Sequence, residues 1–254
     1  MRTKLVTLLG VATMMTATVA VARDFFTETL VLNNKVHTYA VYVPETDVER
    51  VPVVLFLHGA GERGQDLKLA TSLGLDRFLP HAEDALIVAP QVNSGGWWTD
   101  PGYMKLAMAA LEDAISEYRG DRNRIYIAGI SMGGHGALHL TAAYPDTFAA
   151  ALIMCARVSR PNYLNSLPNI DIPVSELAQK LNAVPLWMFH GEADPIVPVR
   201  NARKLYRALR SKAAPANYTE LANADHNIWN TVMGDPAVAD WLLSHSRHQP
   251  IPEV

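Results

Sequence analysis

Hydrophobic and polar residues alternate in two segments near the start of the chain. Residues 27–32 and 35–43 both show this two-residue period, and Asn33 and Asn34 lie between them. Alternation is typical of a strand with one buried face, and an asparagine pair between two such strands favours a tight turn. The pattern therefore predicts an antiparallel hairpin.

Further along, short hydrophobic runs show no alternation, as expected for strands that are buried on both faces. Segments with helical spacing separate them. These runs are 53–57, 85–89, 124–128, 150–155 and 185–189, and a final strand is expected at 216–221. The expected helices are 66–78, 104–118, 133–143, 200–211 and 237–245. Because strands and helices alternate, we expect an α/β fold in one domain, with a mostly parallel sheet and helices on both of its faces.

The interval 156–184 breaks this alternation. It contains three prolines and several turn-forming asparagines, with one short helix expected at 174–181. Long irregular excursions in compact domains are usually functional. The interval is expected to form a small cap or lid insertion, and a solvent-facing loop is the alternative that the sequence leaves open.

The first 22 residues have the features of a secretory signal peptide. Arg2 and Lys4 precede an uncharged, largely apolar stretch, which ends in Ala20-Val21-Ala22. Small residues at this spacing predict cleavage after Ala22. The apolar stretch is short for a membrane span, which needs about 20 residues. We therefore expect a secreted or periplasmic protein with a mature domain at 23–254 and no stable membrane anchor.

Composition and charge narrow the class of protein. The chain of 254 residues is 49% hydrophobic and 19% charged, which suits a soluble globular protein. Its net charge is −3 and becomes −5 without Arg2 and Lys4, and no run of basic residues is present, so nucleic-acid binding is disfavoured. The single cysteine, Cys155, excludes an intramolecular disulfide and lies in an apolar run, which predicts a buried thiol and not a nucleophile.

The most informative motif is G-x-S-x-G, formed by Gly129-Ile-Ser131-Met-Gly133. An expected strand precedes it and an expected helix follows it. In this context the glycines allow a tight turn that lifts the serine hydroxyl above the sheet, where the helix N-terminus favours developing negative charge. The motif predicts that Ser131 is a nucleophile; a glycine-rich turn used only for packing is the alternative.

A serine hydroxyl needs a base, and the base needs an orienting acid. Asp194 and His226 follow Ser131 in the chain order of nucleophile, acid and histidine, each on a loop after an expected strand. Glu192 and Asp225 are rival acids, although Asp225 is adjacent to His226 and badly placed to contact its ring. The remaining candidates for the base are His58, His135, His139 and His190.

Acyl transfer also needs hydrogen-bond donors for an oxyanion. The backbone N–H of Met132, directly after the nucleophile, is one expected donor. Gly59 and Gly61 allow close backbone approach in the loop after the strand 53–57, and the N–H of Ala60 is the second expected donor. No clustered cysteine and histidine spacing, H-E-x-x-H motif or phosphate-binding glycine loop is present in the sequence, so no metal or cofactor is expected.

Several motifs together resemble one enzyme family. They are LHGAGERG, VAPQ followed by a tryptophan pair, DRNRIYIAGISMGG, AAYPDTFAA, FHGEADPIVP and DHNIW. The chain is similar over roughly His58 to Leu243 to secreted carboxylesterases and predicted peptidases of the α/β-hydrolase superfamily, near feruloyl and acetylxylan esterases, polyhydroxybutyrate depolymerases and the prolyl oligopeptidase catalytic domain. The resemblance implies a sheet of about eight strands, a triad of Ser131, Asp194 and His226, an oxyanion hole from the Ala60 and Met132 amides, and metal-free ester hydrolysis through an acyl-enzyme.

Aromatic side chains supply candidates for substrate binding. Trp97, Trp98 and Trp229 would converge near the site in such a fold, where aromatic walls suit a sugar ring or an aromatic acyl group. Tyr163 is a further candidate within the irregular interval, together with Leu164 and Leu167. Packing in the core is the alternative for each tryptophan.

These features favour a serine ester hydrolase that acts on short-chain or plant-derived esters of the acetyl or feruloyl type, either as small molecules or attached to a polymer. A serine peptidase of the prolyl oligopeptidase kind and a polyester depolymerase are the enzymatic alternatives. A non-catalytic binding protein on a hydrolase fold is the alternative from another class. The sequence leaves the oligomeric state open.

Overall fold

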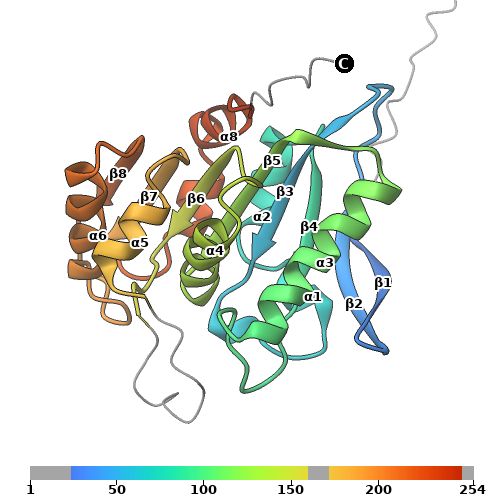
Figure 1. The fold of residues 1–254 in the computed structure, drawn as a ribbon, viewed down its shortest axis with the longest axis horizontal. Coiled ribbons are helices and arrows are strands. Elements are labelled where there is room, and N and C mark those ends of the chain that lie inside the picture. Colours follow the sequence, from blue (N-terminus) through green and yellow to red (C-terminus); the bar gives the residue numbers. More distant parts are fainter. Residues whose placement is uncertain (1–23, 160–171, 248–254) are drawn as a thin grey trace, which may run out of the picture.

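The computed structural model describes residues 24–159 and 172–247, which form an eight-stranded sheet flanked by helices (Figure 1). The strand order is β1-β2-β4-β3-β5-β6-β7-β8. The strands are β1 (Phe26–Leu32), β2 (Lys35–Tyr42), β3 (Val51–Leu57), β4 (Leu86–Pro90), β5 (Gly120–Ile130), β6 (Ala150–Met154), β7 (Leu186–Gly191) and β8 (Ala216–Leu221). Pairs that involve β1 or β2 are antiparallel and all later pairs are parallel. The predicted α/β architecture is confirmed.

The first two strands form the predicted hairpin. Leu32 pairs with Lys35, and the two residues between them, Asn33 and Asn34, have φ of 52° and 61°. Positive φ at both central positions defines the type I′ turn, which asparagine tolerates better than most residues and which matches the twist of the strands. The turn lies at the edge of the sheet where the parallel strands end, because Tyr39 of β2 pairs with Pro90 at the end of β4.

The central strands are buried on both faces, and alternate residues serve two separate cores. In β3, Leu55 and Leu57 belong to one hydrophobic cluster, and Val54 and Phe56 belong to the other. This division explains why the strand sequences show continuous hydrophobic runs and no alternation.

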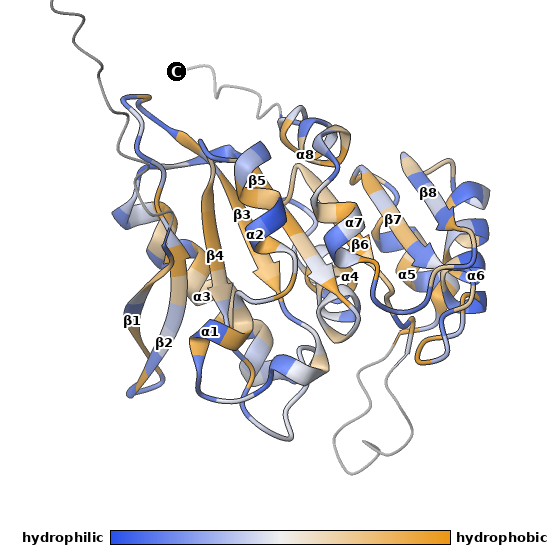
Figure 2. Cartoon of the chain, turned by 180° about the vertical axis from the view of Figure 1, so that it is seen from behind, coloured by the Kyte–Doolittle hydropathy of each residue, from blue (hydrophilic) through white to orange (hydrophobic). Residues whose placement is uncertain are grey.

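Helices cover each face of the sheet. The first face carries α3 (Pro101–Glu117), α4 (Met132–Ala143), α5 (Val174–Lys180) and α6 (Arg200–Ser211), which lie in front of the sheet in Figure 1. The opposite face, seen in Figure 2, carries α2 (Leu75–Phe78), α7 (Trp229–Met233) and α8 (Pro236–Leu243). The short α1 (Leu67–Ala70) and the 3₁₀ turns Ala60–Glu62 and Leu79–His81 complete the connections around β3 and β4.

The single helix expected at 66–78 is wrong. The segment forms the two short helices α1 and α2, which are separated at Gly74. Gly74 has φ of +70°, a left-handed conformation that ends a helical path, and a side chain there would meet Met233 of α7 at 3.0 Å. Helix α7 was not expected from the sequence, and it is α7 that packs against this break.

Two predictions concern residues that the structure does not describe. The signal peptide predicted at 1–22 and the central part of the insertion predicted at 156–184 lie outside the described residues. The short helix expected at 174–181 corresponds to α5. Within residues 24–159 and 172–247, no helix is long and apolar enough to cross a membrane.

Candidate active site

Ser131 lies at a sharp turn between β5 and α4. Its φ of 55° and ψ of −108° place it outside the regions that non-glycine residues favour, and it is the residue between the last position of β5 and the first of α4. The hydrogen bond from its N–H to the carbonyl of Met154 on β6, at 2.8 Å, holds the strained backbone in place. Such strain costs about 1–3 kcal/mol and persists where surrounding structure over-determines the conformation. The turn presents the hydroxyl at the carboxyl end of the sheet.

The start of α4 approaches the end of β3 so closely that only glycine fits between them. A Cβ atom on Gly133 would lie 1.8 Å from the carbonyl oxygen of Leu57 and 2.7 Å from that of His58. The last glycine of G-x-S-x-G therefore sets the distance between the nucleophile turn and the loop that follows β3.

His226 and Asp194 meet Ser131 at this edge of the sheet. His226, on the loop after β8, has its Nε2 3.0 Å from Ser131 Oγ and its Nδ1 2.7 Å from Asp194 Oδ2. Asp194 lies on the loop after β7. The two loops are joined by a hydrogen bond from Ala193 N–H to the carbonyl of Ala224, at 2.9 Å. Three residues that are far apart in the sequence thus form a continuous chain of hydrogen bonds.

The carboxylate of Asp194 is buried and fully engaged. Oδ1 accepts hydrogen bonds from the N–H groups of Ile196 and Val197, both at 2.8 Å, and Oδ2 contacts His226. Burial by itself raises the pKa of Asp194, but hydrogen bonds from His190, His226 and Val197 outweigh burial and hold this pKa well below its usual range. Asp194 is therefore negatively charged in the folded protein at neutral pH.

The rival acids lie in other contacts. Glu192 accepts from Asn223 N–H at 3.1 Å, and Asp225 accepts from Asn227 N–H at 2.7 Å. Both carboxylates serve the backbone of the loops that carry Asp194 and His226. The structure thus brings Asp194, and neither rival, to the ring of His226.

The alternative histidines are buried and engaged elsewhere. His58 contacts the carbonyl of Gly59 through Nδ1 and accepts from Val92 N–H through Nε2, and burial lowers its pKa to about 4. His135 accepts from the Trp97 indole N–H at 2.9 Å, and its ring lies against His139. His190 contacts the carbonyl of Val197. The ring nitrogen within hydrogen-bond distance of Ser131 Oγ is His226 Nε2.

The two expected oxyanion donors both open a helical turn. Met132 is the first residue of α4, and Ala60 is the first residue of the 3₁₀ turn Ala60–Glu62. Amides at the start of a helical turn have no acceptor within it. The loop that carries Ala60 adjoins Ser131, since a Cβ on Gly59 would lie 3.8 Å from Ser131 Cβ.

Three side chains hold this loop, and two of them, Arg63 and Gln91, were not singled out from the sequence. Arg63 Nε donates to the carbonyl of Ala60 at 2.8 Å, and Gln91 Nε2 donates to the carbonyls of Glu62 and Asp66 at 2.7 and 2.9 Å. The Trp98 indole N–H donates to the carbonyl of His58 at 2.9 Å. Arg63 and Gln91 belong to the motifs LHGAGERG and VAPQ, so the motifs pointed to both residues. Their partners are backbone carbonyls, which a residue pattern does not specify.

The four proposed substrate-binding aromatics have different positions. Trp97 and Trp98 are buried, at 2% and 0% exposure, and their indoles bond to His135 and to the loop after β3, so they occupy packing positions in this structure. Trp229 is half-buried, and its ring centroid lies 6.1 Å from that of His226. Tyr163, with Leu164 and Leu167, lies outside the described residues. Among the three of these aromatics that the structure describes, Trp229 is therefore the one that lies beside His226 and is partly exposed to solvent.

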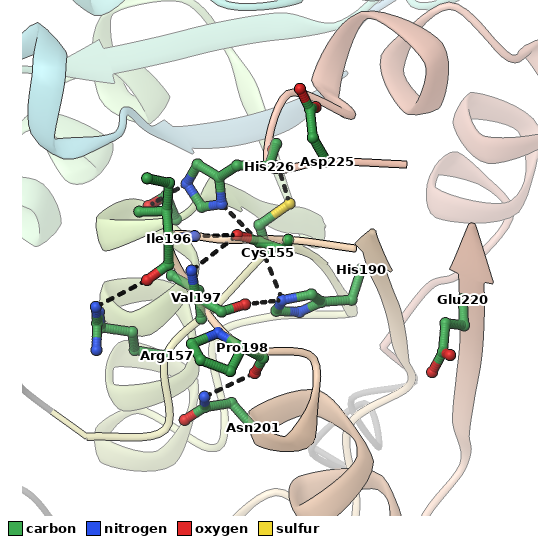
Figure 3. Close-up of polar contacts among 12 residues, drawn as sticks. Cys155, Arg157, His190, Ile196, Val197, Pro198, Asn201, Glu220, Asp225 and His226 are labelled. Atoms are coloured by element: carbon green, nitrogen blue, oxygen red, sulfur yellow. Dashed lines mark hydrogen bonds and ion pairs between the residues drawn. The ribbon is translucent and has the colours of Figure 1, made fainter. Parts of the chain in front are cut away.

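Cys155 contacts the backbone of His226. Its Sγ donates a hydrogen bond to the carbonyl of His226 at 3.2 Å, as Figure 3 shows, and burial raises its pKa to about 12. Among the described residues, Cys155, Asp194 and His226 are a set whose ligand atoms approach within 4.8 Å, as a metal site would require. Both oxygens of Asp194 and both ring nitrogens of His226 are already engaged in hydrogen bonds, so the hydrogen-bond chain explains this cluster better than a metal does.

Comparison with known proteins assigns the chain to a family. Residues 104–242, which include Ser131, Asp194 and His226, match the family model described as Phospholipase/Carboxylesterase. A secreted protein of Arthroderma benhamiae is 29% identical over 235 residues, covering 80% of this chain but only 25% of that protein. A Bacillus subtilis protein named as an esterase, YitV, is 26% identical over 218 residues, covering 70% of this chain and 84% of its own length.

Solved structures share the fold. A thermostable esterase has a TM-score of 0.75 and 27% identity, covering 88% of this chain and 63% of its own. A ferulic acid esterase has a TM-score of 0.70 at 21% identity, covering 87% of this chain and 98% of its own. With the family model matching more than half of the sequence, the chain belongs to the phospholipase/carboxylesterase family of the α/β-hydrolases.

Proposed function

We propose that the chain is a carboxylic-ester hydrolase in which Ser131 is the nucleophile, His226 the general base and Asp194 the orienting acid. The observation that carries this proposal is the continuous hydrogen-bond chain from Ser131 Oγ through both ring nitrogens of His226 to Asp194 Oδ2. A serine hydroxyl becomes an effective nucleophile when an adjacent base takes its proton, and the base needs a third group to fix its tautomer.

The geometry supports a two-step reaction. Asp194 accepts the Nδ1 proton of His226 and leaves Nε2 free to take the proton of Ser131 as Oγ attacks the ester carbonyl. The Ala60 and Met132 N–H groups face the oxyanion of the tetrahedral intermediate. His226 then returns its proton to the departing alcohol, and Ser131 is left as an acyl ester.

Deacylation repeats these roles with water as the nucleophile. His226 takes a proton from water as the water attacks the acyl ester, and it returns that proton to Ser131 Oγ as the carboxylic acid leaves. The ionised Asp194 stabilises the imidazolium formed in each step.

We propose short-chain and plant-derived esters as substrates. A cleft of about 620 Å³ opens at the same edge of the sheet, lined by residues that include Asn33, His37, Gly64, Asn93 and Tyr103. Its lining also includes Gln91, which holds the loop that carries Ala60, but it does not include Ser131, Asp194 or His226.

A panel of p-nitrophenyl esters of increasing acyl length tests the activity, with feruloyl and acetyl sugar esters and a peptide amide added. The wild-type enzyme is expected to hydrolyse the short esters, and Ser131→Ala is expected to lower kcat by at least 10³-fold while remaining folded. Inactivity of the wild-type enzyme across the whole ester panel would exclude the proposal. Faster cleavage of the peptide amide than of any ester would favour a peptidase instead.

We also propose that the protein is exported. The proposal rests on the signal-peptide features of residues 1–22 and is consistent with the secreted relative from Arthroderma benhamiae. N-terminal sequencing of the protein from a periplasmic or culture fraction should begin at Arg23-Asp24-Phe25.

A further inference from the structure

A second histidine contacts the same carboxylate oxygen of the proposed catalytic acid as His226 does. His190 is the penultimate residue of β7 and is completely buried. Its Nε2 lies 2.7 Å from the carbonyl oxygen of Val197 and 3.2 Å from Asp194 Oδ2 (Figure 3). Two imidazole rings thus contact Asp194 Oδ2, and it is His226 that extends to Ser131 through its second ring nitrogen.

The partners of His190 identify the nitrogen that carries its proton. Both atoms near Nε2 are oxygens that only accept hydrogen bonds, so Nε2 bears the proton and directs it mainly to Val197, with Asp194 Oδ2 as the longer contact. Nδ1 is buried and has no hydrogen-bond partner within the described part of the chain. A second proton on Nδ1 would therefore have no acceptor, and the arrangement suits a neutral ring that donates through Nε2.

These contacts close a ring of interactions around the acid. Asp194 Oδ1 accepts from Val197 N–H, the carbonyl of Val197 accepts from His190 Nε2, and the same Nε2 lies against Asp194 Oδ2. The backbone amides fix one carboxylate oxygen, and His190 faces the other. The carboxylate therefore cannot rotate away from His226 without breaking a contact in this ring.

We propose that His190 is a positioning residue that holds Asp194 and its loop in the orientation that His226 requires for proton transfer. The inference rests on the proposed triad and adds a fourth member that touches neither the substrate nor Ser131. It explains why a histidine is buried directly before the loop of Asp194. If this position served only for packing, a hydrophobic residue would suit it equally well.

Two substitutions separate the hydrogen bond from the volume of the side chain. His190→Gln can place an amide N–H near the position of Nε2, and we expect it to keep kcat within about threefold of wild type. His190→Leu fills the space without a donor, and we expect kcat for p-nitrophenyl acetate to fall at least tenfold while KM stays within twofold. The rate of Ser131 labelling by a fluorophosphonate should fall in parallel, since it reports activation of the nucleophile without any substrate preference.

A matched control is Met188→Ala on the same strand. Met188 is buried in the core and is not part of the ring of contacts, so this variant should lower the melting temperature and leave kcat per folded molecule unchanged. If His190→Leu does not fold, His190→Asn replaces it, because its shorter amide does not reach Val197, and the same loss of kcat is expected.

Wild-type kcat in folded His190→Leu or His190→Asn would overturn the inference, as would a defect in His190→Gln equal to that of His190→Leu. Neither result would affect the proposed function. That proposal fails on different observations, namely an inactive wild-type enzyme or an active Ser131→Ala variant.

Discussion

Asp194 combines burial with a negative charge, and four N–H groups surround its two oxygens. Replacing it by asparagine keeps the shape and removes the charge. The amide can also donate to His226 Nδ1 and so stabilise the wrong tautomer of the base. The same change in another serine triad lowers kcat by about 10⁴-fold. We expect Asp194→Asn to lower kcat by about 10³ to 10⁴-fold in a p-nitrophenyl ester assay, and a loss below tenfold would remove Asp194 from the triad.

The charge of Asp194 also links stability to pH. Its pKa in the folded protein lies well below the value of about 3.9 expected when unfolded. A group with a depressed pKa stabilises the fold at pH above the unfolded value, and this contribution is lost as pH falls toward the folded value. The free energy of unfolding should therefore fall more steeply below pH 4 in the wild type than in Asp194→Asn, as measured by urea titration between pH 3 and 6. Parallel curves would contradict this.

At the scale of elements, α4 and β3 are in contact at Gly133. A methyl group there would overlap the Leu57 carbonyl, which lies 1.8 Å from the Cβ position, and backbone at the end of a buried strand cannot move aside without disturbing the sheet. We expect Gly133→Ala to destabilise the protein by roughly 3 kcal/mol and to lower kcat, since α4 also carries the Met132 N–H.

The control for this substitution is Gly102→Ala in α3. A Cβ there meets no atom within 4 Å, so the change should raise stability by about 0.5–1 kcal/mol through the better helix propensity of alanine. Thermal unfolding measures both variants. Equal stability of the two variants would mean that α4 can shift away from β3.

A further element contact joins β5 to the end of α8. The buried Tyr126 hydroxyl donates to the carbonyl of His245 at 2.6 Å, with the carbonyl of Leu243 at 3.0 Å as second acceptor. Burial raises the pKa of Tyr126 to about 12. A tyrosine whose folded pKa is raised stabilises the fold below the unfolded value of about 10, and this contribution is lost as pH rises toward 12.

Tyr126→Phe should therefore cost about 1 kcal/mol at pH 8, where the hydroxyl is neutral in both states. Between pH 10 and 12 the stability advantage of the wild type over Tyr126→Phe should shrink. In this range the unfolded wild type gains free energy by ionising Tyr126, and the variant has no hydroxyl to ionise. Denaturant unfolding at several pH values checks both statements. A difference that grows with pH would show that the hydroxyl is not held as the structure indicates.

The element boundaries show which information the sequence holds. Hydrophobic runs identified the central strands because burial on both faces requires nonpolar side chains at successive positions, and alternation identified β1 and β2. The break at Gly74 and the helix α7 were not predicted, since each depends on the other across the fold and glycine alone does not require a positive φ. The local sequence pattern thus predicts strands and helices whose side chains are buried in the core. It does not predict short elements, such as α2 and α7, that stabilise each other by contact.

At the scale of the whole molecule, one edge of the sheet collects the candidate site. Chain order and strand ends were enough to propose Ser131, Asp194 and His226, because parallel strands end at the same edge and short loops leave little freedom there. The roles of His190, Arg63 and Gln91 could not be derived in this way. Their partners are carbonyl groups and a loop whose conformation exists only in the folded chain.

The whole fold also determines how the protein should respond to redox conditions. The one cysteine is buried, and its pKa of about 12 keeps the thiol protonated, so the fold depends on its two hydrophobic clusters and not on a disulfide. A chain of this size buries roughly 70–75% of its unfolded surface, which is sufficient without a covalent link. We expect the melting temperature to be the same with and without dithiothreitol, and Cys155 to react with a thiol reagent only in denaturant. Rapid labelling of the native protein would show that the loop of His226 opens readily above Cys155, and a melting temperature lowered by dithiothreitol would reveal a disulfide between two chains.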